Sequence, residues 1–260
     1  MNVSWQAIDN EVKSWLKQAR ELILTKMDSD LQVSTKSGPN DLVTNLDKQV
    51  EQFYISQIKQ KFKHSRILGE ESCKEEGLLS FDGLFWVIDP IDGTMNFVKE
   101  KENFASMIAI YKQGKPYMAY IYDVMKDRLV WGGPALGAVY CNQTQLPAPK
   151  QHALKDGLVA ISCPMVLANY RNVVEVIKAS SGCRMVGSAG IEFINLILGK
   201  HCAYLSYLRP WDFLPGKILG ETLGLSVKTI DDEKVDVVSS SVVLVATKSA
   251  HTEIIELVNR

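Results

Sequence analysis

The segment that most constrains the fold is an apolar run that ends in two aspartates three residues apart. The apolar run at 84–88 is followed directly by Asp-Pro-Ile-Asp-Gly-Thr at 89–94. Pro90 stops a strand from continuing, Gly93 permits a tight turn, and a short helical pattern begins at Thr94. We therefore expect a strand–turn–helix unit with both carboxylates at the end of the strand.

Carboxylates beside the start of a helix suit phosphate chemistry. Asp89 and Asp92 offer hard oxygen ligands for Mg²⁺ or Mn²⁺. The N–H groups of Gly93 and Thr94 would stabilise an anion at the start of the helix. Taken alone, the segment fits equally well a structural turn in which Asp89 caps the helix and Asp92 is solvated.

Two further acidic segments favour the metal interpretation. Glu70 and Glu71 follow another short apolar run, and Asp212 lies between Trp211 and Phe213. A lone Glu-Glu pair is usually a solvated loop, and an aspartate between aromatic residues is often a helix cap. Capping can coexist with metal ligation, so neither structural interpretation excludes a shared site.

The rest of the chain divides into two parts with different patterns. Helical spacing predicts helices at 3–27 and about 42–62, and apolar runs predict strands at 84–88, 104–111, 117–122, 129–131 and 138–141. After a polar, proline-containing segment at 144–153, the patterns predict strands at 158–162 and 242–247, and helices at about 167–179, 189–199, 215–223 and 250–259. We expect a layered α/β (α+β-like) catalytic domain, 1–260, with lobes at about 1–148 and 149–260.

Composition excludes several classes of protein. A chain of 260 residues can bury a core without disulfides or structural metals, and its formal net charge of -1 indicates neither nucleic acid nor membrane as a partner. The cysteines are odd in number and form no C-x-x-C pair, which favours reduced thiols. We see no signal peptide and no apolar stretch long enough to span a membrane, so we expect a cytoplasmic protein.

Together the motifs resemble the inositol monophosphatase family, within the superfamily that includes fructose-1,6-bisphosphatase and bisphosphate nucleotidases. They are Lys36, Asp41-Leu42-Val43-Thr44, Asp47, Gly69-Glu70-Glu71-Ser72, Asp89 to Thr94 with Asn96-Phe97, Gly187-Ser188-Ala189 and Trp211-Asp212. The D-P-I-D-G-T run is highly specific, and the order and spacing of the others agree. The resemblance implies an αβαβα sandwich of the sugar-phosphatase type, usually a homodimer. It also implies lithium-sensitive hydrolysis of a small phosphorylated metabolite.

The resemblance also implies a site for up to three Mg²⁺ ions, with Mn²⁺ as an alternative. Glu70, Asp89 and the Ile91 carbonyl would hold the first ion. Asp89, Asp92 and Asp212 would hold the second, and Glu70 with water would hold a weaker third. Bound metal would polarise the phosphate and lower the pKa of the attacking water. Without cations, so many neighbouring carboxylates would raise one another's pKa.

For catalysis, the resemblance assigns Thr94 and Asp47, with Glu70, to orienting or deprotonating the attacking water. Asp47 could instead lie on a solvated helix face, and we expect its neighbour Glu51 at the surface or behind the metal ligands. Asp92, Gly93 and Thr94 would contact phosphate. Gly187, Ser188 and Ala189 would form the substrate loop, although Ser188 fits an ordinary helix cap equally well.

Four residues are weaker candidates. Lys36 would be an electrostatic partner near the third metal, and Glu71 a weak ligand. Arg209 would meet an anionic substrate or form a surface salt bridge. Ser206 lies where family members that prefer inositol phosphates carry a glutamate that binds sugar hydroxyls. The loss of that glutamate loosens selectivity, so inositol 1-phosphate itself is not predicted.

Three functions remain open at this stage. The first is a Mg²⁺-dependent phosphatase of a small phosphorylated polyol or sugar. The second is a phosphatase of NADP or 3′-phosphoadenosine 5′-phosphate, which Arg209 and nearby tyrosines keep open. The third is a regulatory protein that retains the fold and binds macromolecules, but the complete acidic set argues against a purely non-catalytic role.

We predict that Asp92→Asn nearly abolishes Mg²⁺-dependent phosphate release while leaving the fold intact, because one metal ligand is lost. Release of inorganic phosphate and circular dichroism measure the two effects. Activity like that of the wild type in the mutant would sink the assignment.

Overall fold

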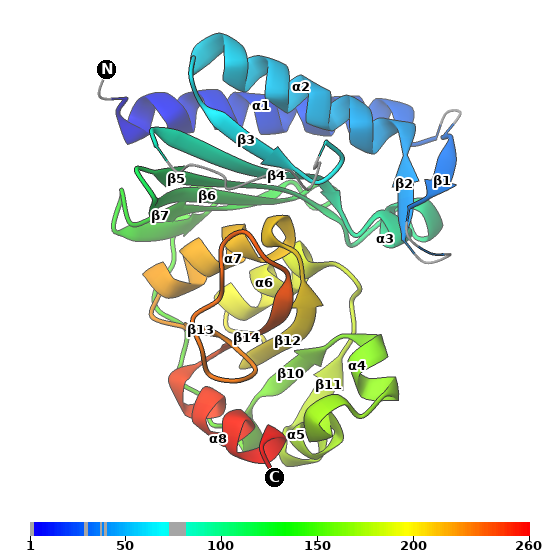
Figure 1. Ribbon diagram of the computed structural model, residues 1–260, viewed down its shortest axis with the longest axis vertical. Coiled ribbons are helices and arrows are strands. Elements are labelled where there is room, and N and C mark those ends of the chain that lie inside the picture. Colours follow the sequence, from blue (N-terminus) through cyan, green and yellow to red (C-terminus); the bar gives the residue numbers. More distant parts are fainter. Residues whose placement is uncertain (1–2, 29–30, 37, 39–40, 73–81) are drawn as a thin grey trace.

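The computed structural model describes residues 3–28, 31–36, 38, 41–72 and 82–260. Helices and sheets alternate in layers from α1 and α2 at one end to α4, α5 and α8 at the other (Figure 1). A seven-stranded sheet and a five-stranded sheet form the two β layers, with α6 and α7 between them. The layered α/β sandwich predicted from the sequence is therefore confirmed.

The first sheet is mainly antiparallel, and only β3 and β4 run parallel. Its spatial order follows the chain: β3 (Arg66–Gly69), β4 (Leu84–Asp92), β5 (Ala105–Lys112), β6 (Lys115–Asp123), β7 (Arg128–Gly133), β8 (Ala138–Cys141) and β9 (Thr144–Gln145). A small antiparallel pair, β1 (Val33–Thr35) and β2 (Leu42–Thr44), lies beside it.

Both faces of the first sheet are buried, which explains why its strands are almost continuously apolar. On β4, Trp86 and Ile88 pack toward α1 (Trp5–Lys26) and α2 (Asn45–Lys61). Phe85 and Val87 on the same strand pack toward the central helices. Side chains that alternate along a strand point to opposite faces, so one strand contributes to two cores.

The second sheet has the order β11-β10-β12-β14-β13. Its strands are β10 (Leu158–Ile161), β11 (Gly182–Arg184), β12 (Ala203–Leu208), β13 (Ser226–Thr229) and β14 (Ser241–Ala246). The helices α6 (Ala189–Ile197) and α7 (Pro210–Thr222) fill the space between the sheets, and α4 (Cys163–Leu167), α5 (Val173–Ala179) and α8 (Lys248–Val258) cover the far side.

The first half of the chain departs from prediction at two element boundaries. The helix expected from residue 42 begins at Asn45, because 42–44 pairs as β2 and the Thr44 side chain caps α2 by accepting N–H bonds from residues 46 and 47. The strand expected to stop before Pro90 continues to Asp92 through an irregular register between Asp89 and Asp92. A bulge tolerates a proline that a regular ladder would not.

The second half shows two further differences. A helix was expected at 167–179, but Asn169, Arg171 and Asn172 have positive φ, so α4 and α5 are separate. The helix expected from Pro215 already begins at Pro210, where the missing N–H costs nothing. Pro215 lies inside α7, and the fully buried Phe213 and Leu214 show that packing overrides the local preference.

Two further predictions concern disulfide bonds and membrane-spanning helices. The four cysteines in the described ranges form no disulfide, and Cys73 lies outside those ranges. Among the described helices, none combines the length and the apolar character that crossing a bilayer requires.

The contact between α6 and α7 depends on a glycine. A Cβ added at Gly216 would overlap the ring of Phe193. We predict that Gly216→Ala destabilises the fold by about 1–3 kcal/mol through overpacking, lowering the melting temperature by several degrees. Gly220→Ala is the matched control, since its Cβ would lie 3.4 Å from Leu225 in ordinary contact. Equal melting temperatures for the two variants would contradict this account of the interface.

Candidate active site

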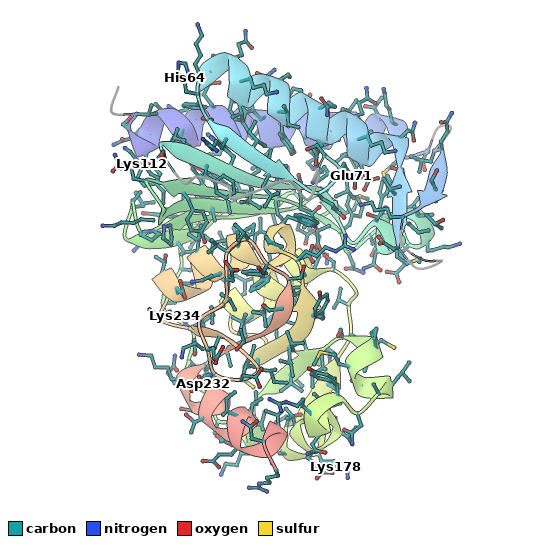
Figure 2. All side chains as sticks on the ribbon, viewed as in Figure 1. His64, Glu71, Lys112, Lys178, Asp232 and Lys234 are labelled. Atoms are coloured by element: carbon teal, nitrogen blue, oxygen red, sulfur yellow. The ribbon has the colours of Figure 1, made fainter. Side chains whose placement is uncertain are left out.

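The predicted site residues converge on a small pocket of about 190 Å³ at one end of the first sheet. Its lining comes from the start of β2, the turn after β3, the end of β4, the start of α3 (Thr94–Lys99), the loop before α6 and the first turn of α7. Figure 2 marks this region by Glu71, which lies below α2 at the end of the sheet nearer β2. Segments far apart in the sequence therefore meet at one acidic pocket.

Three aspartates form the floor of this pocket. One carboxylate oxygen from each of Asp89, Asp92 and Asp212 lies within 4.8 Å of the other two. Asp89 and Asp92 are buried at the end of β4, and Asp212 is partly exposed in the first turn of α7. Asp212 is not the N-cap itself, since it accepts the backbone N–H of the N-cap residue Arg209 at 2.8 Å. This contact leaves oxygen lone pairs of Asp212 available to the pocket.

Electrostatics makes these carboxylates hard to ionise together. Burial, followed by repulsion from Glu70, Asp92 and Asp212, raises the pKa of Asp89 well above its ordinary value. Burial and the charges of Glu70 and Asp92 do the same for Asp212. Burial also raises the pKa of Asp92 to about 6, although hydrogen bonds oppose the shift.

The pocket residues fit a divalent cation. Oδ1 of Asp89 is buried and has no hydrogen-bond partner among the described residues. An uncompensated buried oxygen beside other carboxylates is costly. Hard oxygen donors of negative charge are what Mg²⁺ and Mn²⁺ prefer, and a cation would relieve both the repulsion and the missing contact.

Asp92 also holds the start of α6. It accepts hydrogen bonds from the Ser188 hydroxyl, from the Ala189 N–H at 3.1 Å and from the Gly190 N–H at 2.7 Å. The Ser188 oxygen in turn accepts the Ile191 N–H at 3.3 Å, so the predicted helix cap is confirmed. Ser188 therefore both caps α6 and contacts Asp92, a residue of the acidic pocket.

Asp47 is fully buried, which excludes the alternative of a solvated helix face. Its Oδ2 accepts the backbone N–H of Thr44 at 2.8 Å in a capping box, and its Oδ1 lies 3.1 Å from the Thr94 hydroxyl. The Thr94 hydroxyl also lies 3.2 Å from the Ile91 carbonyl. Burial raises the pKa of Asp47, so its carboxylate binds protons more readily than an exposed one.

Lys36 reaches both glutamates of the turn after β3. Its Nζ lies 2.8 Å from Oε1 of Glu70 and 2.5 Å from Oε1 of Glu71. Burial raises the pKa of Glu70 to about 7 despite this ammonium group. Burial disfavours the charged form of Lys36. Its contacts with Glu70 and Glu71 outweigh this effect and raise the pKa of the ammonium group.

A second pocket of about 490 Å³ adjoins the acidic pocket and shares Asp92, Gly187 and Asp212 with it. Ser188, Ala189 and Ser206 are among the residues that line it. None of the described lining residues is lysine, arginine or histidine. Arg209 does not line it and instead lies 3.6 Å from Asp41, which confirms the salt-bridge alternative.

Two side chains to which the motifs assign no role fix the substrate loop. The Asn96 amide donates to the Val186 carbonyl at 2.7 Å, and Oε1 of Glu192 accepts the Val186 N–H at 3.0 Å. The Asn96-Phe97 pair belongs to the family motif, so the sequence marks Asn96 as a residue near the site. No such signal marks Glu192, because an acid in the first turn of a helix is common for reasons of the helix dipole.

The layered fold and its acidic, cation-fitting pocket agree with a metal-assisted hydrolase of phosphate monoesters. A family model described as "Inositol monophosphatase family" matches residues 4–260. Inositol-1-monophosphatase of Bacillus subtilis (strain 168) is 38% identical over 258 residues, covering 97% of each chain. Nus factor SuhB of Escherichia coli (strain K12) is 32% identical over 197 residues, 74% of this chain and 73% of SuhB. The chain therefore belongs to the inositol monophosphatase family.

Solved structures agree with this assignment. An IMPase/NADP phosphatase complexed with Mg²⁺ and phosphate superposes with a TM-score of 0.89 at 26% identity, covering 97% of this chain and 95% of that one. Staphylococcal inositol monophosphatase-1 in a LiCl-soaked inhibitory complex gives a TM-score of 0.91 at 26% identity, covering 99% and 96%. The likeness therefore extends over nearly the whole chain.

The raised carboxyl pKa values predict how stability depends on pH without metal. Glu70 and Asp92, with pKa values of about 7 and about 6, bind protons more tightly in the folded protein than in the unfolded chain. The stabilisation of the folded protein by these two groups is greatest at acidic pH and is lost as the pH rises through these pKa values. We predict that the melting temperature in chelator falls by several degrees from about pH 5 to about pH 8.

Added Mg²⁺ should remove most of that fall, because it compensates the ionised carboxylates. Differential scanning fluorimetry with chelator or Mg²⁺ measures both effects. A stabilisation by Mg²⁺ that is equal at acidic and alkaline pH would contradict the electrostatic account.

Proposed function

We propose that this protein is a Mg²⁺-dependent phosphatase that hydrolyses phosphate monoesters of small neutral polyols or sugars. The observation that carries the proposal is the junction of two pockets at Asp92 and Asp212. One pocket is small and acidic, as a cation and phosphate require. The other is larger and offers polar groups without cationic side chains among its described residues.

The proposed metal assignment is the one that the family resemblance implies, and the cluster of Asp89, Asp92 and Asp212 supports it. Glu70, Asp89 and the Ile91 carbonyl would hold one ion, and Asp89, Asp92 and Asp212 a second, with a weaker third at Glu70. Mg²⁺ is the proposed ion, and Mn²⁺ fits the same donors. When bound, such cations supply charge that polarises the phosphate and lowers the pKa of a coordinated water.

The chain's own residues would orient the water and receive its proton. Thr94 is held by Asp47 at 3.1 Å, which fixes its hydroxyl at the start of α3. A water that attacks phosphorus beside Thr94 can pass its proton through that hydroxyl toward Asp47, with Glu70 as a second acceptor. The raised pKa of Asp47 suits this role. Gly93 and Thr94 would offer backbone N–H groups to the phosphate.

The alcohol part of the substrate would occupy the larger pocket. Gly187, Ser188, Ala189 and Ser206 line it, and Glu100 and Glu192 add acidic character. Hydroxyl groups donate well to such acceptors, whereas a second phosphate would meet repulsion. The lining therefore favours a neutral polyol or sugar over a dinucleotide or a bisphosphate.

NADP is the second candidate substrate, and the comparisons supply its support. A solved IMPase/NADP phosphatase with NADP and Ca²⁺ has a TM-score of 0.91 to this chain at 26% identity. Arg209, which favoured a nucleotide in the sequence, lies 3.6 Å from Asp41 and does not line the larger pocket. We therefore rank NADP and 3′-phosphoadenosine 5′-phosphate below polyol phosphates.

A regulatory role is the candidate of another class. Its support is the similarity to SuhB, which is named a Nus factor. The full set of pocket carboxylates supports catalysis in this chain, and a regulatory role would be additional to it.

The assembly is also a proposal. We propose one catalytic domain with lobes at about 1–148 and 149–260, a homodimer in solution, and a cytoplasmic location. The proposed boundary lies between the two sheets, in the segment that joins β9 to β10. Membership of the family supports the homodimer.

We predict that phosphate release from polyol and sugar monophosphates exceeds release from NADP and 3′-phosphoadenosine 5′-phosphate by at least about tenfold in kcat/KM, since the larger pocket lacks a partner for extra phosphates. The measurement is a malachite-green assay with Mg²⁺ on a panel that includes inositol 1-phosphate and fructose 1,6-bisphosphate. Preference for NADP would reverse the ranking of substrates. No release from any compound would favour the regulatory role.

A further inference from the structure

The side chain of Glu51 is a buried acid for which the mechanism above has no use. Glu51 lies on α2 one helical turn after Asp47, and both residues are 0% exposed. Its burial corrects the sequence-based alternative of a surface position. The helix therefore presents two carboxylates from one face to the end of the sheet that carries the site.

Each of these carboxylates holds a different part of the site. Asp47 contacts Thr94 at the start of α3. Oε2 of Glu51 accepts the backbone N–H of Glu71 at 2.7 Å, and the preceding amide of Glu70 donates to the Ile88 carbonyl at 3.2 Å. The turn that carries Glu70 is thus fastened to the sheet by one amide and to α2 by the next.

The absence of a side chain at Gly69 permits the same contact. Its φ lies outside the left-handed region, so backbone conformation does not require glycine there. A Cβ at residue 69 would instead lie 2.6 Å from Cδ of Glu51. The missing side chain of Gly69 makes room for the carboxylate of Glu51 against the turn.

Simple packing does not explain an acid at this position. Oε1 of Glu51 is buried and has no hydrogen-bond partner in the described part of the chain. A buried oxygen without a partner costs free energy that an apolar side chain would not. The contacts that Glu51 does make, to the Glu71 N–H and to Ser72, all go to the turn that carries Glu70.

We propose that Glu51 is a positioning residue that fixes the Glu70 turn and thereby sets the affinity for the cation that Glu70 would hold. The inference rests on the proposed function, because it takes Glu70 as a ligand. Groups that orient a ligand from behind influence metal affinity by roughly 10–100-fold.

The test is a Mn²⁺ titration followed by electron paramagnetic resonance, with melting temperature measured in parallel. Glu51→Ala removes the acceptor for the Glu71 N–H and should weaken Mn²⁺ binding by roughly tenfold or more. It should also raise the Mg²⁺ concentration needed for half-maximal activity. Glu51→Gln keeps an oxygen that can accept the same N–H, so it should restore most of the affinity.

Gly69→Ala probes the contact from the other side and should also weaken Mn²⁺ binding, because the added methyl displaces the carboxylate. Gly220→Ala adds the same methyl far from the site and should bind Mn²⁺ as the wild type does. If Glu51→Ala does not fold, Gly69→Ala and Glu51→Gln carry the test.

Wild-type Mn²⁺ affinity in folded Glu51→Ala or in Gly69→Ala overturns the proposal and leaves Glu51 a merely structural residue. An equal loss in Glu51→Gln and Glu51→Ala also overturns it, since charge rather than the hydrogen bond would then matter. Mn²⁺ binding by a wild-type protein that hydrolyses no phosphate ester would refute the proposed function but leave the test of Glu51 readable.

Discussion

Repulsion among closely spaced carboxylates is the constraint on which the rest of this structure depends. Asp89, Asp92 and Asp212 lie close enough to disfavour one another's charge. Each is nevertheless held by backbone geometry: two by the irregular end of β4, and the third by the first turn of α7. The fold holds together groups that would separate in water, and a cation supplies what the protein leaves uncompensated.

The helices around the pocket support its carboxylates in different ways. The α2 helix contributes no floor residue, yet Asp47 and Glu51 reach from it to Thr94 and to the turn after β3. The first two N–H groups of the α6 helix donate to Asp92. The helices on both faces of the first sheet therefore serve as supports for its end, which explains why acids on α2 are as buried as its apolar residues.

Much of the site could be predicted because its residues occur in short contiguous motifs. Asp89 to Thr94 specify a turn through proline and glycine, and the remaining ligands keep a family spacing that sequence preserves. Asn96 and Glu192 are different, because their partner is a backbone amide at Val186 that no local pattern marks. Glu51 was expected at the surface or behind the metal ligands, and the sequence could not decide between the two because the turn that covers it is 20 residues away along the chain.

The same contrast holds for the fold. Strands with both faces buried, such as β4 and β5, stood out as apolar runs. The strand β12 was not predicted, since Ala203–Leu208 mixes serine and tyrosine with apolar residues. Pro215 was taken as the start of a helix that in fact contains it, because the burial of Phe213 and Leu214 outweighs the local cost of proline.

The bonds from Asp92 to Ala189 and Gly190 join residues 97 and 98 positions apart. During synthesis, the strand that ends in Asp92 leaves the ribosome long before the helix that it caps. A growing chain can complete its first sheet and still lack the substrate loop and Asp212. The acidic pocket is therefore complete only in the last quarter of translation, when the first turn of α7 brings Asp212 to the end of β4.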